Sequence, residues 1–214
     1  MTTVSEGEAA FLQRDYARAK EIWTGQLRQG DVSAGAWLGA LYANGLGVER
    51  DPATAFKLYL GAAEAGNLFA ANNVAVMYSR GEGVAPDLER ACHWLRTTAE
   101  QGDLFAQFNY ATALTSGIGI VIDLPEALRW FRRAAEAGHY LSQAQLGHCY
   151  AEGIGTDVDR VEAFIWLSSA SRHGINRATT DLKGLLQEMT DTEKAEAVKR
   201  SPGLSGPTQI APAA

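Results

Sequence analysis

Residues 70–102 read AANNVAVMYSRGEGVAPDLERACHWLRTTAEQG, and this stretch holds most of one repeating unit. Its first half has four apolar residues at the spacing i, i+4, i+7, i+8: Ala70, Val74, Met77 and Tyr78. This spacing is typical of a helix with one buried face. Gly81 follows, where a positive φ can end a helix without a Cβ clash. Asp87 precedes a second apolar-periodic segment and can cap it by accepting unpaired backbone N–H groups. The stretch therefore predicts two antiparallel helices joined by a short linker.

Five positions of this unit recur at a step of 36 residues. They are the glycine pairs Gly45/Gly47, Gly81/Gly83, Gly117/Gly119 and Gly153/Gly155, the aspartates Asp51, Asp87, Asp123 and Asp159, the alanines Ala55, Ala91, Ala127 and Ala163, and the last glycines Gly66, Gly102, Gly138 and Gly174. One helix pair cannot bury such a surface alone, whereas stacked pairs can. We therefore predict an all-α protein, a right-handed α-solenoid of stacked antiparallel helix pairs with a 36-residue period.

The period also predicts how the chain is divided. Thr190 and Glu193 have the spacing of a capping box that opens a last, more polar helix. The tail after that helix holds three prolines and no charge, which is typical of disorder. The expected segments are 1–33 for a partial repeat that caps the N-terminus, 34–69, 70–105, 106–141 and 142–177 for four repeats, 178–200 for capping helices, and 201–214 for a disordered tail.

Side-chain size and polarity at the repeated positions predict how the helices fit together. Small residues on the first helices let a neighbouring helix come close: Gly39, Ala75, Ala111 and Gly147. Large residues on the second helices are expected to fill the space between pairs: Trp94, Trp130 and Trp166. Glu126 and Glu162 stand three residues after the capping aspartates, which predicts capping boxes there as well.

The repeats resemble the Sel1-like repeat family, a relative of tetratricopeptide repeats, in segments such as LGALYANGLGV at 38–48 and AAEAG at 62–66. The step of 36 with its Gly-x-Gly linker separates them from the 34-residue tetratricopeptide unit. The resemblance covers residues 34–177 and departs from the pattern at Leu114, which takes a tyrosine slot. It implies a scaffold or adaptor for protein complexes, without catalysis.

Composition argues against several classes of function. The net charge of −6 disfavours a nucleic-acid binder, because neutralising phosphates requires clustered cations. No window approaches the roughly 18 apolar residues of a membrane span. The first ten residues lack the basic and apolar regions of a secretory signal, and the two cysteines show no paired spacing. We therefore expect a cytoplasmic protein without disulfides.

Motifs for cofactor or catalytic chemistry are missing. The Gly-x-Gly linkers lack the third glycine and the preceding strand of a dinucleotide site. No two histidines stand at i, i+4, which disfavours a zinc site. The motifs Ser-x-x-Lys and Gly-x-Ser-x-Gly are absent, which disfavours β-lactamase-like or other hydrolytic activity. We expect no cofactor, no metal and no catalytic residue. Cys92 and Cys149 are expected to be buried as small apolar residues, with a redox or metal-binding thiol as the alternative.

The partner is expected to bind along the first helices, which line the concave wall of such a stack. On a helical wheel, Asn73 and Arg80 point away from the packing face of Val74 and Tyr78. The predicted binding residues are Trp37, Asn44, Asn73, Arg80, Asn109, Gln145 and His148. Amides both donate and accept hydrogen bonds, so they suit an extended peptide backbone, and Trp37 would anchor an apolar side chain. The alternative is that these amides only bridge neighbouring repeats.

The sequence thus predicts a protein-interaction scaffold that binds a peptide or protein in its groove, either as a monomer or as a weak homo-oligomer. A second hypothesis is a self-associating structural repeat protein without a peptide groove. In that case, exposed aromatic residues such as Phe108 or Tyr140 would form the contact between copies.

Overall fold

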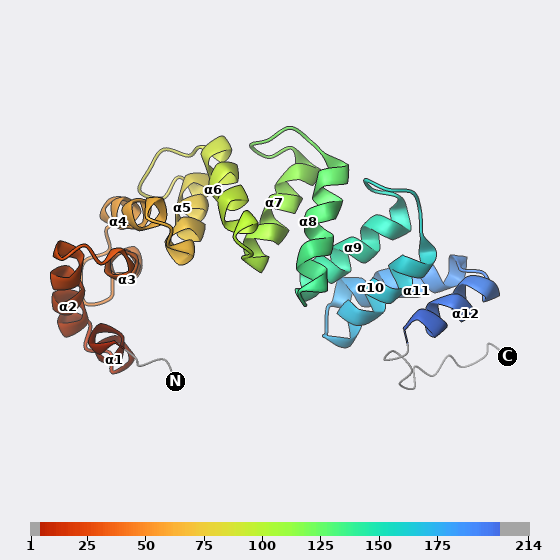
Figure 1. Cartoon of the computed structure of the whole chain (residues 1–214), viewed down its shortest axis with the longest axis horizontal. Helices are drawn as coiled ribbons and strands as arrows, with labels where there is room; N and C mark the ends of the chain where they lie inside the picture. The colour runs from red at the N-terminus through yellow and green to blue at the C-terminus, as the bar shows by residue number, and fades with distance from the viewer. Residues whose placement is uncertain (1–4, 202–214) are drawn as a thin grey trace. The chain divides into compact units, whose positions relative to one another are not determined.

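The computed structural model describes residues 5–201, which form twelve α-helices and no strand (Figure 1). These residues divide into two compact units. The first comprises the chain up to residue 106 together with 118–120, and the second comprises 107–117 and the chain from residue 121 onward. Apart from Ser201, the tail predicted to be disordered lies outside the described residues.

The first unit is a succession of helix pairs. Its helices are α1 (Glu6–Leu12), α2 (Tyr16–Arg28), α3 (Val32–Asn44), α4 (Pro52–Glu64), α5 (Leu68–Arg80) and α6 (Leu88–Glu100). Each helix contacts the next one along the chain, and α3 also contacts α5. First helices of successive repeats therefore lie against one another, as stacking of the helix pairs requires.

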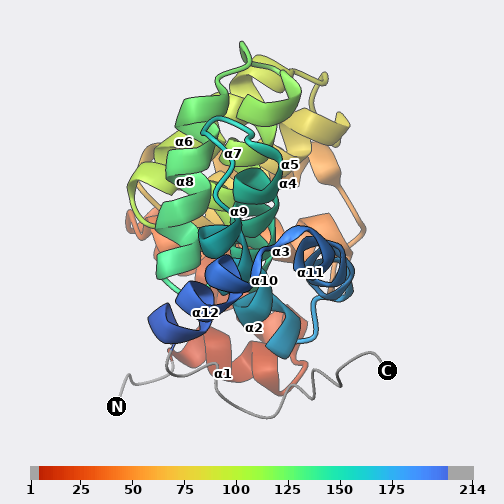
Figure 2. The same ribbon diagram turned by 90° about the vertical axis from the view of Figure 1, so that its right-hand side faces the viewer.

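The second unit is also built from helix pairs, and each helix from α8 to α11 contacts its neighbour in that series. Its helices are α7 (Leu104–Ser116), whose first three residues belong to the first unit, α8 (Leu124–Glu136), α9 (Tyr140–Glu152), α10 (Arg160–Arg172), α11 (Asn176–Glu188) and α12 (Asp191–Arg200). The first helices α9 and α11 contact each other, and the second helix α10 contacts α12, which Figure 2 shows beside it. Thr190 and Glu193 form the predicted capping box at the start of α12.

The aspartates cap the second helices as predicted. The Asp51 carboxylate accepts hydrogen bonds from the backbone N–H of Thr54 at 3.1 Å and from its hydroxyl at 2.6 Å. These bonds stabilise the charged form and hold the pKa of Asp51 below its usual value. Equivalent caps begin the other second helices: Asp87 for α6, Asp123 for α8 and Asp159 for α10.

The two glycines of each linker have different roles. Gly81 ends α5 in the left-handed conformation, with φ of +70°. Gly83, with φ of +72°, lies against the first turn of the preceding second helix, where an added Cβ would be 2.1 Å from the carbonyl oxygen of Pro52. The same close approach recurs at Gly47 with Tyr16, at Gly119 with Leu88 and at Gly155 with Leu124. The second glycine therefore sets the distance between successive repeats.

The predicted packing positions are buried, with one correction. Val74, Met77 and Tyr78 belong to a buried cluster with residues of α3, α4 and α6. A Cβ at Gly39 would lie 2.9 Å from the Tyr59 ring, which confirms the close helix approach expected there. The tryptophans of the second helices, by contrast, are only half-buried: Trp94, Trp130 and Trp166.

The second correction concerns the predicted capping boxes. Glu126 and Glu162 do not return to the capping residue of their helices. The Trp130 Nε1–H donates to Glu126 at 2.7 Å, and the Trp166 Nε1–H donates to Glu162 at 3.1 Å. The polar edge of each half-buried indole needs an acceptor, and the carboxylate one turn earlier on the same helix face supplies it.

Candidate functional site

A pocket in the first unit brings together three of the predicted binding residues. Its volume is 390 Å³, and it opens between the C-terminal halves of α3 and α5. Asn44, Asn73 and Arg80 line it, with Val76 from the same face of α5. The remaining lining residues come from α3, the two linkers, α4 and α5: Ala43, Arg50, Pro52, Tyr59, Met77 and Glu82.

The two asparagines are held by their own helices. The Asn44 Nδ2–H donates to the carbonyl oxygen of Ala40 at 2.8 Å, and the Asn73 Nδ2–H donates to that of Phe69 at 2.7 Å. Each bond uses one of the two amide N–H groups and does not involve the amide oxygen. These bonds orient the side chains within one helix and do not join neighbouring repeats.

Gln143 is the amide that does bridge neighbouring elements, and sequence reasoning missed it. Its Nε2–H donates to Ala135 at the end of α8 at 3.1 Å, and its Oε1 accepts from Ser169 of α10 at 2.9 Å. Gln143 is buried, on the packing face rather than the outward face of its helix. The same repeat position holds alanine, Ala71, two repeats earlier. A polar residue at this position was therefore the available signal.

Three charged side chains surround the pocket. The Arg50 Nη2 and the Arg80 Nη1 each lie 3.8 Å from a carboxylate oxygen of Glu82. The Arg50 Nε–H also donates to the carbonyl oxygen of Ala43 at 3.1 Å, which fixes the guanidinium at the pocket edge. Sequence reasoning identified Arg80 but not Arg50 or Glu82, because the latter two lie in linkers.

Trp37 lies in an aromatic cluster and is not among the residues that line the pocket. Its ring stacks on Trp23 with centroids 5.3 Å apart and planes 7° apart, and the Phe11 ring lies 5.7 Å away. Phe69 contacts the other side of this cluster, with its ring 6.2 Å from that of Trp37. The half-buried indole therefore contributes to packing between α1, α2 and α3, and a role as ligand anchor gains no support.

The other predicted binding residues lie in the second unit. Asn109 is exposed on α7, and Gln145 is half-buried on α9. The His148 Nδ1 lies 3.6 Å from a carboxylate oxygen of Asp181 on α11. These three residues are therefore described separately from the pocket of the first unit.

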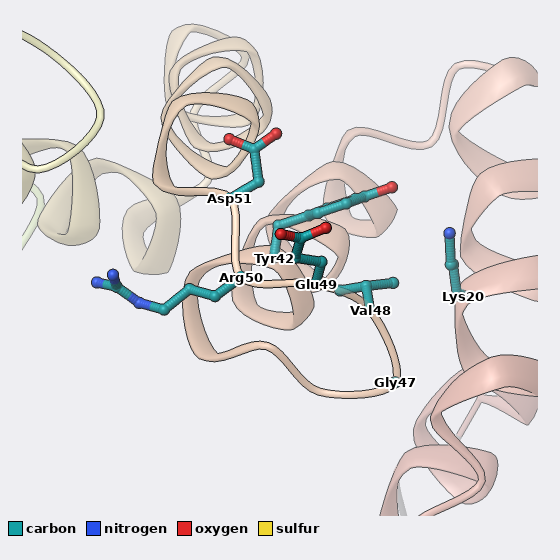
Figure 3. A pocket seen from close by; sticks show the side chains of 7 residues that line it. All are labelled: Lys20, Tyr42, Gly47, Val48, Glu49, Arg50 and Asp51. Atoms are coloured by element: carbon teal, nitrogen blue, oxygen red, sulfur yellow. The ribbon is translucent and has the colours of Figure 1, made fainter.

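A second pocket of the first unit lies on the other side of the α3–α4 linker, with a volume of 510 Å³. Figure 3 shows Lys20 reaching from α2 toward Tyr42, whereas Arg50 points to the opposite side. The Lys20 Nζ is 5.6 Å from the centre of the Tyr42 ring, a cation–π distance. Asp51 caps α4 and Lys20 faces Tyr42, so these two charged groups of the pocket already have structural partners.

The surface residues proposed for self-association are only partly available. Phe108 is half-buried, with its ring 5.8 Å from Phe131 and 5.4 Å from His139, so the expectation that it is exposed is wrong. Tyr140 is 43% exposed, but its ring stacks on His173 at 3.7 Å.

Neither cysteine has the environment of a reactive thiol. Cys92 and Cys149 are free and buried, and the Cys92 Sγ–H donates to the carbonyl oxygen of Ile118 at 3.0 Å. Burial raises the pKa of the Cys149 thiol to about 11 and that of Cys92 in the same direction. Within residues 5–201, no three His, Cys, Asp or Glu side chains are placed to hold a metal ion. No helix of the same range is long and apolar enough to cross a membrane.

Both thiols are therefore expected to resist a disulfide reagent in the native protein. Near pH 8 they stay protonated, and only the thiolate reacts. Ellman's reagent should label neither within minutes, and both once the chain is unfolded in guanidinium chloride. Rapid labelling of the native protein would show that burial does not protect these thiols.

The raised pKa of Cys149 also makes stability depend on pH. It stabilises the fold below about pH 9, and this contribution is lost as the pH rises toward about 11.

Comparison with known proteins agrees with this architecture. The model of the Sel1 repeat matches residues 33–67, 68–103, 104–139 and 141–175. A Sel1 repeat protein from Oxalobacter formigenes is similar, with a TM-score of 0.83 and 28% sequence identity over 96% of this chain and 87% of that one. No curated protein sequence matches the chain.

A second solved structure is similar over part of its length. It is c5321, a protective antigen present in uropathogenic Escherichia coli strains that displays an SLR fold, with a TM-score of 0.73 and 28% identity. The match covers 93% of this chain and 46% of that antigen, so the chain spans about half its length. These structures confirm the all-α solenoid class expected from the sequence. With four consecutive repeats matched over more than half of its residues, the chain belongs to the Sel1 repeat family.

Proposed function

We propose that this chain is a non-catalytic protein-interaction module, and that its first unit binds an extended peptide segment of a partner protein in the pocket between α3 and α5. One observation carries the proposal. Asn44, Asn73, Val76 and Arg80, which come from successive first helices, line a single pocket of 390 Å³. Sel1 repeats are typical of scaffolds for protein complexes, which agrees with this role.

The pocket combines the two kinds of contact that an extended peptide needs. Asn44 and Asn73 supply amides for the peptide backbone, which carries both donors and acceptors. Val76 is 40% exposed, and Phe69 on the same face of α5 is 51% exposed, so an apolar side chain of the ligand has surfaces to cover. Burial raises the pKa of Tyr59 to about 12, and its hydroxyl is therefore neutral at physiological pH.

The outward residues of the second unit, Asn109, Gln145 and His148, are proposed as a further binding surface of the same kind. Self-association through Tyr140 is the weaker hypothesis, because the ring already stacks on His173.

The test is a panning experiment with phage-displayed random dodecapeptides on the full chain. Peptides recovered on the wild type are resynthesised with a fluorescent label, and their affinity is measured by anisotropy. Asn73→Ala is expected to weaken binding about 3–10-fold, as the loss of one hydrogen bond predicts, with an unchanged melting temperature. Gln29→Ala, at an exposed position at the end of α2, is the matched control and should leave the affinity unchanged.

Two outcomes would overturn the proposal. Peptides that bind the wild type and Asn73→Ala equally well would place the binding site elsewhere. A large drop in the melting temperature of Asn73→Ala would indicate that the amide serves the stability of the stack.

A further inference from the structure

We propose that the pocket between α3 and α5 selects an acidic peptide, whose carboxylate takes the position between Arg50 and Arg80 that Glu82 now occupies. This inference rests on the proposed peptide-binding function and names the chemistry of its partner. It begins with the three charged residues that line the pocket, Arg50, Arg80 and Glu82.

Two of these residues, Arg50 and Glu82, depart from the repeat pattern. The position of Arg50 is taken by Pro86, Ile122 and Val158 in the other repeats, and the position of Glu82 by Leu46, Ile118 and Ile154. Two slots that are otherwise uncharged thus carry opposite charges at the boundary where the pocket forms. The helix packing does not require these charges, because the other repeats pack without them.

The contacts among the three side chains are loose. Each guanidinium nitrogen lies 3.8 Å from a Glu82 oxygen, well beyond the roughly 2.7–2.9 Å of a charge-assisted hydrogen bond. The side chains of Arg50, Arg80 and Glu82 are 59%, 67% and 42% exposed. Such exposed pairs contribute little to stability, so another carboxylate can displace Glu82 at low cost.

Charge complementarity favours an anionic ligand. Two arginines face one glutamate, and none of the other lining residues is charged, so the pocket carries a net charge of +1 on a chain whose net charge is −6. At about 0.1 M salt the Debye length is about 10 Å, so the distant negative charges are screened while the two guanidiniums act at close range. Guanidinium presents paired N–H donors that match both oxygens of a carboxylate.

The neighbouring groups indicate what accompanies the carboxylate. Asn44 and Asn73 line the same pocket and suit the peptide backbone. Val76 and Phe69 offer exposed apolar surface along the same face of α5. The ligand is therefore an extended segment with Asp or Glu close to an apolar residue. Glu82 acts as an internal competitor, since its charge repels the carboxylate of the ligand.

The experiment uses the dodecapeptides recovered by panning on the full chain. They are expected to be enriched in Asp or Glu next to an apolar residue. Replacing that acid by its amide in the synthetic peptide should weaken binding about 10-fold, because a hydrogen-bonded charge is lost. Arg50→Gln and Arg80→Gln should each weaken binding by about the same factor. Glu82→Gln should instead strengthen binding about 2–5-fold, as the removal of an exposed like charge predicts.

The matched control is Arg28→Gln, which removes an exposed arginine at the end of α2 outside the pocket and should leave the affinity unchanged. Melting temperatures of all four variants verify that each is folded. Recovered peptides without an excess of acids, or affinities that are insensitive to Arg50, Arg80 and Glu82, would overturn the acidic preference and leave the peptide site intact. Recovered peptides whose binding does not depend on Asn73 would overturn the proposed function itself.

Discussion

Gly83→Ala is expected to lower the free energy of unfolding by more than about 3 kcal/mol. The left-handed φ of +72° costs a non-glycine residue about 1–3 kcal/mol by itself. The added Cβ would also lie 2.1 Å from the carbonyl oxygen of Pro52 and 2.7 Å from the backbone nitrogen of Ala53. Neither atom belongs to a side chain that can rotate away, so the linker and α4 must separate. Gly83→Val should be worse still, because a β-branched residue tolerates positive φ least.

Gly66→Ala is the control that isolates the close approach. Gly66 also has a positive φ, of +93°, but a Cβ there would meet no atom within 4 Å. This variant should therefore lose only the backbone term, about 1–2 kcal/mol. Urea denaturation followed by circular dichroism measures both variants. Equal losses would mean that the contact between the linker and the preceding second helix does not constrain the stack.

Phe131→Ala is expected to cost about 3–5 kcal/mol, the usual penalty for truncating a buried aromatic side chain. Phe131 on α8 is 1% exposed, and its ring lies 5.8 Å from that of Phe108 on α7. Removing the ring leaves a cavity between the two helices of one repeat, and close-packed neighbours fill such a cavity only in part. The urea midpoint of the variant should fall accordingly.

Trp130→Ala is the matched variant on the same helix, and it should cost less, about 1–3 kcal/mol. The sequence predicts that Trp130 fills the space between helix pairs, whereas the structure shows it half-buried, with its Nε1–H bonded to Glu126 and its ring 5.8 Å from that of Tyr110. Part of its surface stays in water, so less apolar area is lost on truncation. A loss of unfolding free energy equal to that of Phe131→Ala would indicate that Trp130 belongs to the core.

Local features of the fold were predictable because they depend on residues close together in the sequence. Gly81 ends a helix through its own φ, and Asp87 caps the next helix through the backbone N–H of Arg90, three residues away. The 36-residue period then carried these assignments to the other repeats. The capping role of Glu126 was predicted wrongly because the same side chain also reaches Trp130, and the local pattern does not decide between these two donors.

The candidate site was predictable only in part. A helical wheel places Asn73 and Arg80 on one face of α5. The position on α3 that is equivalent to Arg80 holds Asn44. Arg50 and Glu82 were not predicted as binding residues, because they lie in two different linkers, 32 positions apart in the sequence. Their charges at otherwise uncharged repeat positions were the available signal, but their meeting at a shared pocket depends on how one repeat stacks on the next.

The sequence by itself determined the helix pairs, their caps and their period, because hydrogen bonding and apolar periodicity act over a few residues. Only the tertiary structure decided the spacing between repeats, where Gly83 meets Pro52, and the spacing of the two helices within a repeat, where Gly39 meets the Tyr59 ring. It likewise decided which outward residues share a pocket and that Trp37 packs into an aromatic cluster instead. Such contacts join atoms far apart along the chain, and their geometry follows from the close packing of whole helices.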